Sequence, residues 1–179
     1  MKLQLKQMCN GDSMGKSSSV SDAGPFIHLD EVDKLSILST FKNVKTTGEV
    51  IAECHKIQAK IERLQNVEVS TIDSAGKNLA KYLINRYEID LGEASALALC
   101  KQERVKLFLT DDLEARNVAQ LLGFEPHGTI GIVTRAFREG FLSKKECLII
   151  LEALYMQSSL YLTKDLFDFV VKEIHRYQK

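Results

Sequence analysis

Short β-like runs alternate with amphipathic helical segments along most of the chain, and this alternation limits the fold more than any other feature. The run VKLFLT at 105–110 is compact and apolar, as in a buried strand. Residues 67–72 alternate in the manner of an edge strand, and 20–26 and 44–46 predict two further short strands. Because helical segments separate these runs, we expect an α/β fold with a central, mainly parallel sheet covered by helices.

The helical segments share apolar residues at spacings of three and four. They are expected at 30–41, 49–64, 73–86, 92–102, 112–122, 129–139, 143–156 and 163–177. With 179 residues, of which 45% are hydrophobic, the chain can bury the core of one domain. We place this domain at 20–179, with 129–179 as a C-terminal helical extension. Residues 1–19 are polar and predict a disordered lead-in or a segment added to the natural protein.

Charge and hydropathy exclude several classes of protein. Lys plus Arg and Asp plus Glu both number 24, so the chain is not a uniformly basic nucleic-acid clamp, although a local basic patch remains open. No apolar run approaches the roughly 18 residues of a membrane helix. The first residues lack the apolar region of a signal peptide, so no membrane partner is expected. Cys9, Cys54, Cys100 and Cys147 lie far apart, which argues against a zinc cluster and for a reduced, cytoplasmic protein.

Acidic residues fall where a parallel sheet binds ligands, at the carboxyl ends of its strands. Asp22 lies in the first strand segment, and Asp111 and Asp112 directly follow the buried run. Glu53 lies on the second helical segment, and Glu93 opens a later one. Carboxylates that converge on one point raise each other's pKa or bind a cation, and hard oxygen ligands select Mg²⁺ or Mn²⁺. One or two such ions deprotonate a water and neutralise a leaving oxygen, which is the chemistry of phosphodiester hydrolysis.

Each acid also has a structural interpretation. Asp112 precedes a helix and fits an N-cap, Glu93 suits a first helical turn, and Glu53 fits a solvent-facing position. Asp22 is harder to explain in this way, because an unpaired charge in a buried strand is costly. Arg116, one turn after Asp112, either pairs with these acids, contacts a substrate phosphate or forms a plain surface ion pair. From the residues alone, a metal site and a set of helix caps both remain open.

Four strings carry a resemblance to a known family: VSDAGPFIHL, TTGEVIAE, DLGEASALAL and LFLTDDLEARNVAQLLG, in this order. In order and spacing they resemble the PIN-domain family, and in particular its VapC-like branch of small prokaryotic proteins. The resemblance runs from about residue 20 to the C-terminus. It implies a three-layer α/β/α domain with a central parallel sheet, whose acids bind Mg²⁺ or Mn²⁺ and cleave RNA.

The resemblance also implies roles for single residues. Catalytic roles fall to Asp22, Glu53, Glu93 and Asp112, and metal ligation falls to Asp22, Glu93, Asp112 and Asp111. The family's T-x-D spacing from Thr110 selects Asp112, with Asp111 beside it, and which of the two contacts the metal directly stays open. Thr110 and Arg116 are expected to contact the substrate.

The function implied by this resemblance is a metal-dependent endoribonuclease, and more narrowly the toxin of a toxin–antitoxin pair. RNA would be its substrate, an antitoxin-like protein its inhibitor, and a homodimer its assembly. A PIN-fold RNA- or protein-binding module that does not cut is the alternative. A phosphotransfer protein also places paired acids on a parallel sheet, but its pair belongs near the first strand, whereas Asp111 and Asp112 follow a late one.

Overall fold

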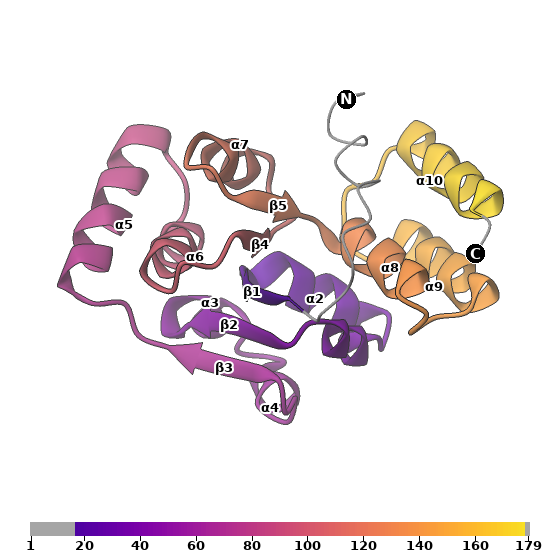
Figure 1. The fold of residues 1–179 in the computed structure, drawn as a ribbon, viewed down its shortest axis with the longest axis horizontal. Coiled ribbons are helices and arrows are strands. Elements are labelled where there is room, and N and C mark those ends of the chain that lie inside the picture. The colour runs from indigo at the N-terminus through magenta and orange to yellow at the C-terminus, as the bar shows by residue number, and fades with distance from the viewer. Residues whose placement is uncertain (1–16, 178–179) are drawn as a thin grey trace.

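Five parallel strands form one sheet in the order β3-β2-β1-β4-β5 (Figure 1). The structure is a computed structural model in which residues 17–177 are described. The strands are β1 (Ser18–Ser21), β2 (Asn43–Thr47), β3 (Val67–Ser70), β4 (Leu107–Leu109) and β5 (Glu125–His127). β1 lies at the centre, where it pairs with both β2 and β4. The predicted parallel sheet is confirmed, and β3 is an edge strand, as its alternating pattern indicated.

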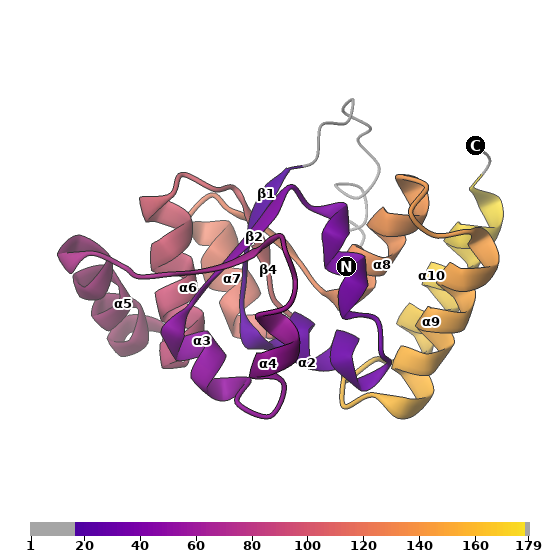
Figure 2. The same ribbon diagram turned by 90° about the horizontal axis from the view of Figure 1, so that it is seen from below.

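Helices cover both faces of the sheet and give the expected three-layer α/β/α fold. They are α2 (Ala23–Glu31), η1 (Leu35–Thr40), α3 (Gly48–Glu53), α4 (Gln58–Ile61), α5 (Ser74–Tyr87), α6 (Leu91–Gln102), α7 (Leu113–Leu121), α8 (Thr129–Arg138), α9 (Lys144–Gln157) and α10 (Lys164–Arg176). In Figure 1, α5, α6 and α7 lie on one side of the sheet, and α2 and α8 lie on the other. α9 packs on α8 and α10 packs on α9, so the C-terminal helices extend the second layer outward (Figure 2).

The core lies against the central strands and the helices that cover them. Val20 of β1, Phe108 of β4 and Phe26 of α2 are fully buried. In α6 every residue from Ala94 to Cys100 is buried. A helix that is enclosed on all sides needs a protein interior around it. Its burial also draws the acid in its first turn, Glu93, toward the inside of the molecule.

The cysteines within the described residues belong to the core. Cys54, Cys100 and Cys147 are buried and carry free thiols. Cys9 lies outside the described residues, as does nearly all of the lead-in predicted at 1–19. Within residues 17–177, each helix is too short or too polar to cross a bilayer.

Two predictions for the first part of the chain are wrong. The strand expected at 20–26 ends at Ser21, and α2 begins at Ala23. Pro25 stands in the first turn of this helix, where backbone N–H groups have no partner within the helix, so a missing N–H costs little. The helix expected at 30–41 is divided: α2 ends at Glu31, and the chain turns through Asp33, whose φ is 54°, before the 3₁₀ helix η1.

Two further differences concern short elements. The helix expected at 49–64 is two short helices, α3 and α4, separated by a turn at 54–57. β5 is a strand that its sequence does not indicate, because Glu-Pro-His contains no β-branched side chain. Pro126 lacks a backbone N–H, but β5 lies at the edge of the sheet, where one side of the strand makes no inter-strand hydrogen bonds.

Candidate functional site

Four of the predicted acids lie at the carboxyl edge of the sheet. Asp22 follows β1, Asp112 follows β4, Glu53 ends α3, and Glu93 lies in the first turn of α6. Figure 2 shows α2 and α3 beginning at the same end of the sheet, as parallel strands require. Glu53 and Asp112 both raise the pKa of Asp22, and Asp112 and Asp22 both raise the pKa of Glu93. We call these four residues the acid cluster.

Asp22 is the most deeply buried member of the acid cluster. It is 5% exposed. Its Oδ2 accepts a hydrogen bond from the Thr110 hydroxyl at 3.2 Å, while its buried Oδ1 has no hydrogen-bond partner among the described residues. Burial, together with the charges of Glu53 and Asp112, raises the pKa of Asp22 to about 6, although hydrogen bonds to the carboxylate from the Ala23 backbone N–H and the Thr110 hydroxyl lower it. A buried acceptor without a donor lowers the stability of the fold, so the unpaired Oδ1 calls for a functional explanation.

Thr110 connects two members of the acid cluster. It is fully buried at the end of β4. Its hydroxyl donates to Asp22 Oδ2 and accepts from the backbone N–H of Asp112, both at 3.2 Å. Because one hydroxyl makes both contacts, Thr110 fixes the first acid of the cluster relative to the last. The structure thus gives Thr110 a contact with the acids, and its predicted contact with substrate stays a prediction.

Glu53 lies against the start of α6 at Gly92. A Cβ atom at Gly92 would stand 2.1 Å from Glu53 Oε1, so this close approach requires glycine. Burial and the charge of Asp90 raise the pKa of Glu53, and a hydrogen bond from the Gly92 backbone lowers it. A carboxylate is also favoured at this position by the positive end of the helix dipole. Gly92 is therefore a site residue that the sequence did not single out, although a glycine in a first helical turn is a visible signal.

Glu93 belongs to the acid cluster and also caps its own helix. Its Oε2 accepts a hydrogen bond from the backbone N–H of Asp90 at 3.0 Å, which is the capping-box contact. Burial raises the pKa of Glu93 to about 7, with contributions from Asp112, Asp22 and Asp90. Asp90 is a further acid at this edge, which the sequence did not single out.

The two neighbouring aspartates after β4 have different surroundings. Asp112 is exposed, and its Oδ1 accepts from the backbone N–H of Ala115 at 2.8 Å, which confirms the N-cap interpretation. Asp111 points to α8 and α2: its Oδ1 accepts from the Thr129 backbone N–H at 2.7 Å, and its Oδ2 accepts from the Thr129 hydroxyl at 2.5 Å and contacts His28 Nδ1 at 2.9 Å. Both oxygens of Asp111 are thus engaged within the protein.

Gly128, directly before α8, is held against Asp111, and a larger residue there is expected to destabilise the fold. A Cβ atom at Gly128 would stand 2.7 Å from Asp111 Oδ1. That oxygen is fixed by the Thr129 N–H, so it cannot move away freely. Gly128→Ala should lower the free energy of unfolding by about 1–3 kcal/mol, the usual cost of overpacking. Urea unfolding measures the change, and equal midpoints for the variant and the natural sequence would show that Asp111 is free to move.

Arg116 lies at the border of the site rather than among the acids. Its Nη1 donates to the backbone carbonyl of Thr110 at 3.2 Å. Burial lowers the pKa of this guanidinium, and the charge of Asp111 opposes that shift. The structure does not pair Arg116 with the acid cluster within salt-bridge distance, so its contact with an RNA phosphate stays a prediction.

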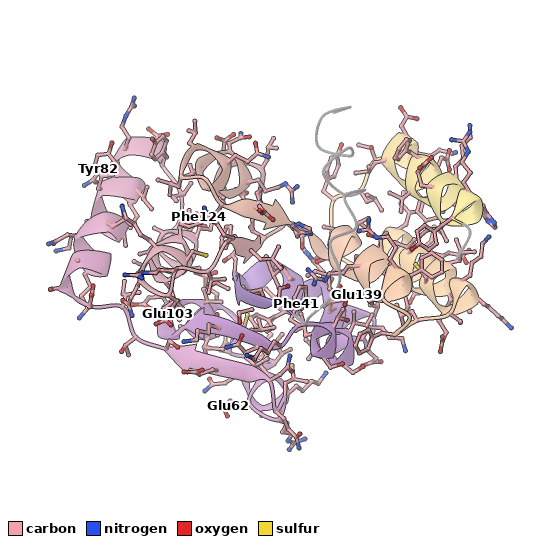
Figure 3. The ribbon with its side chains drawn as sticks, in the orientation of Figure 1. Phe41, Glu62, Tyr82, Glu103, Phe124 and Glu139 are labelled. Carbon is pink, nitrogen blue, oxygen red and sulfur yellow. The ribbon has the colours of Figure 1, made fainter. Side chains whose placement is uncertain are left out.

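Arg135, one of the arginines of α8, makes its contacts within the protein. Arg135 Nε stands 2.7 Å from Glu139 Oε1, and its guanidinium carbon lies 5.0 Å from the centre of the Phe41 ring. Figure 3 shows Phe41 and Glu139 close together beside α8. This charge is therefore already paired and stacked.

Two groups near the acids are held in their neutral forms. Burial, with the charges of Asp22 and Glu53, raises the pKa of the Cys54 thiol to about 12. Burial, with the charges of neighbouring arginines, lowers the pKa of His127 to about 4. A thiol of this kind is not activated as a nucleophile, so the chemistry of this edge rests on carboxylates.

These carboxylates fit a hard divalent cation in their chemistry. They offer oxygen ligands only, and Asp22 Oδ1 is a buried oxygen that lacks a donor. As the side chains lie, no three His, Cys, Asp or Glu residues within 17–177 are arranged to hold one ion together. Glu53, Glu93 and Asp112 are each turned onto a backbone N–H at a helix start. Joint ligation therefore requires these side chains to turn toward Asp22.

Comparison with known families identifies the fold. A family model described as PIN domain matches residues 18–176. The chain belongs to the PIN-domain family. The match spans every strand of this PIN domain and the whole acid cluster. PIN domains are in general nucleases, and those nucleases in general use divalent metal ions. No curated protein matches the chain.

Proposed function

We propose that this PIN domain is a metal-dependent endoribonuclease that hydrolyses phosphodiester bonds of RNA. The observation that supports the proposal most directly is the Asp22 carboxylate. It is 5% exposed, its Oδ1 has no hydrogen-bond partner among the described residues, and two further acids of the cluster raise its pKa. A protein tolerates a buried charge of this kind where a cation neutralises it.

Asp22, Glu93 and Asp112 are the ligands we propose for Mg²⁺ or Mn²⁺. When bound, such an ion neutralises phosphate charge and lowers the pKa of water. Thr110 holds Asp22 Oδ2 through its hydroxyl, which leaves Oδ1 as the oxygen that would be available to a bound ion. Glu53, at the end of α3, adds a further negative charge where its carboxylate lies against Gly92 of α6. Asp111 is omitted from this ligand set because both of its oxygens accept hydrogen bonds elsewhere.

Incubation with RNA tests the proposal. The protein is expected to cleave single-stranded RNA of mixed sequence when Mn²⁺ or Mg²⁺ is present, and to stop when excess chelator is added. Asp112→Asn keeps an oxygen for the N-cap of α7 but removes the charge, so cleavage should fall while the fold persists. Intact RNA at every metal concentration, for single-stranded and structured RNA alike, would contradict the proposal.

A PIN-fold binding module that does not cut is the second candidate. The arrangement of Glu53, Glu93 and Asp112 on backbone N–H groups favours it, because helix capping alone accounts for these contacts. Such a module would bind RNA or a protein in excess chelator with unchanged affinity. It would not cleave RNA with or without Mn²⁺, whereas a nuclease of the proposed kind would cleave with Mn²⁺ and stop in excess chelator.

Gly92→Ala should separate the function of Glu53 from the stability of the fold. The added Cβ displaces the Glu53 carboxylate, which lies at the end of an exposed, flexible side chain and can swing away. The free energy of unfolding should therefore change by no more than about 1 kcal/mol, the difference in helix propensity between Gly and Ala. Mn²⁺ affinity, measured by calorimetry, should fall about tenfold, the size of effect seen for residues next to metal ligands, because the Glu53 charge moves away from the site.

Gly48→Ala is the matched control for this prediction. Gly48 begins α3, the helix that carries Glu53, and an added Cβ there meets no atom within 4 Å. Its Mn²⁺ affinity should equal that of the natural sequence. If both variants bind Mn²⁺ equally well, Glu53 has no part in the site.

We further propose that the nuclease is the toxin of a toxin–antitoxin pair, as the resemblance to the VapC-like branch implies. This proposal includes a homodimer, cytoplasmic location and an antitoxin-like protein as inhibitor. Expression of the chain alone in a bacterial host should arrest growth, and Asp22→Asn should relieve the arrest. Normal growth with intact, soluble protein would contradict the toxin role.

A further inference from the structure

Asp111, Thr129 and His28 form a partly buried contact next to the acid cluster, and we call it the Asp111 contact. The Asp111 carboxylate accepts from the backbone N–H and the hydroxyl of Thr129, at 2.7 Å and 2.5 Å, and lies 2.9 Å from His28 Nδ1. The side chains of His28 and Asp111 are only 14% and 11% exposed. Hydrogen bonds to a carboxylate in such surroundings are among the stronger ones in proteins.

The Asp111 contact joins three parts of the fold. Asp111 lies between β4 and α7, Thr129 begins α8, and His28 lies in α2. Asp22 stands directly before α2, and Asp112 follows Asp111. The contact therefore holds α2, which begins directly after Asp22, against the β4–α7 connection, which carries Asp112.

We propose that Asp111 is a positioning residue, which sets the distance between Asp22 and Asp112 through Thr129 and His28 without contacting the metal itself. This inference rests on the proposed function, because it assigns a role within that metal site. Thr110 makes the complementary connection on the other side, since its hydroxyl touches Asp22 Oδ2 and the Asp112 N–H. The adjacent aspartates thus have separate roles: Asp112 is a member of the acid cluster, and Asp111 connects the segments that carry the cluster.

Thr129→Val distinguishes this role from direct ligation, because the two interpretations predict opposite changes. If Asp111 positions the acids, loss of the Thr129 hydroxyl loosens α8 from the β4–α7 connection, and Mn²⁺ affinity falls about tenfold, as for other residues that orient ligands. If Asp111 were a ligand, loss of its competing donor would leave Mn²⁺ affinity unchanged or increase it. Thr129→Ser keeps the hydroxyl and should restore the natural affinity.

Matched variants exclude a general effect of Thr→Val in α8. Thr134 also lies in α8 and is buried, but its hydroxyl donates to the Gly131 carbonyl within the same helix. Thr134→Val should therefore leave Mn²⁺ affinity within about twofold of the natural value, the scatter of unrelated sites. His28→Leu removes the α2 side of the contact and should lower Mn²⁺ affinity in the same direction as Thr129→Val.

A measurement on the metal-free protein makes the outcome independent of metal binding. In ¹H–¹⁵N spectra, the Asp22 amide resonance should shift in Thr129→Val and His28→Leu, and it should return in Thr129→Ser. An unchanged Asp22 resonance in both disruptive variants would overturn the positioning role, whatever their Mn²⁺ affinity. A chain that binds no Mn²⁺ while its Asp22 resonance responds as expected would instead refute the proposed function and retain the positioning role.

Discussion

Asp22→Asn is expected to abolish RNA cleavage and to weaken Mn²⁺ binding by at least about a hundredfold, the upper range for residues that only orient metal ligands. The substitution is nearly isosteric and keeps an oxygen for the Thr110 hydroxyl. What it removes is the buried negative charge, including the partnerless Oδ1. Calorimetric titration of Mn²⁺ into both proteins measures this effect without knowledge of the RNA target.

Ser19→Ala is a suitable control for Asp22→Asn. Ser19 is buried in the same strand, β1, but its hydroxyl reaches the Asn43 carbonyl, at the far end of the strand from the acids. Its Mn²⁺ affinity and cleavage rate should remain those of the natural sequence. Equal Mn²⁺ binding by the natural sequence and Asp22→Asn would mean that the acids act as caps and surface charges, and the binding module would become the preferred function.

The sequence predicts those elements in which apolar residues recur at regular spacings over many positions. The apolar run at 105–110 contains β4, and the three helices expected after residue 129 are present with small shifts of their ends. The failures involve short elements whose geometry depends on distant contacts. β5 is a strand because it pairs with β4, since Glu-Pro-His contains no β-branched or large aromatic residue that would mark it as a strand.

The apolar pattern at 49–64 fits a continuous helix, yet the chain forms α3 and α4 with a turn between them. Periodicity reports which side chains face inward, and both short helices satisfy the same pattern, so it does not distinguish them from one long helix. The same limit applies to 20–26, where apolar side chains face the core from the end of β1 and the start of α2.

The acids of the candidate site could be placed because parallel strands bring their carboxyl ends to one edge. The surroundings of each acid could not be predicted. Asp111 and Asp112 are neighbours in sequence, but one is enclosed by Thr129 and His28 and the other is exposed. Gly92 matters because α3 brings Glu53 onto it, which is a contact between segments 39 positions apart in the chain.

Without metal, Asp22 is expected to make the protein less stable as the pH rises. Burial raises its pKa from 3.8 to about 6 in the folded state. Between these values the unfolded chain has already lost the proton that the folded chain retains, so the free energy of unfolding decreases with rising pH. The decrease ends above the folded pKa, where the full shift corresponds to about 3 kcal/mol. Asp22→Asn cannot ionise and should lack this contribution.

Urea unfolding in chelator, at about pH 4.5 and about pH 8, measures the contribution of Asp22 by difference. From the lower to the higher pH, the free energy of unfolding of the natural sequence should fall by about 2 kcal/mol relative to that of Asp22→Asn. This is the part of the Asp22 penalty that develops in this pH range. The pKa of Glu93 is also raised, but Glu93 is present in both proteins, so most of its effect cancels in the comparison. Parallel pH profiles would contradict the raised pKa of Asp22. The expected divergence would instead show that the fold retains a destabilising buried charge, which is reasonable where that charge serves to bind a cation.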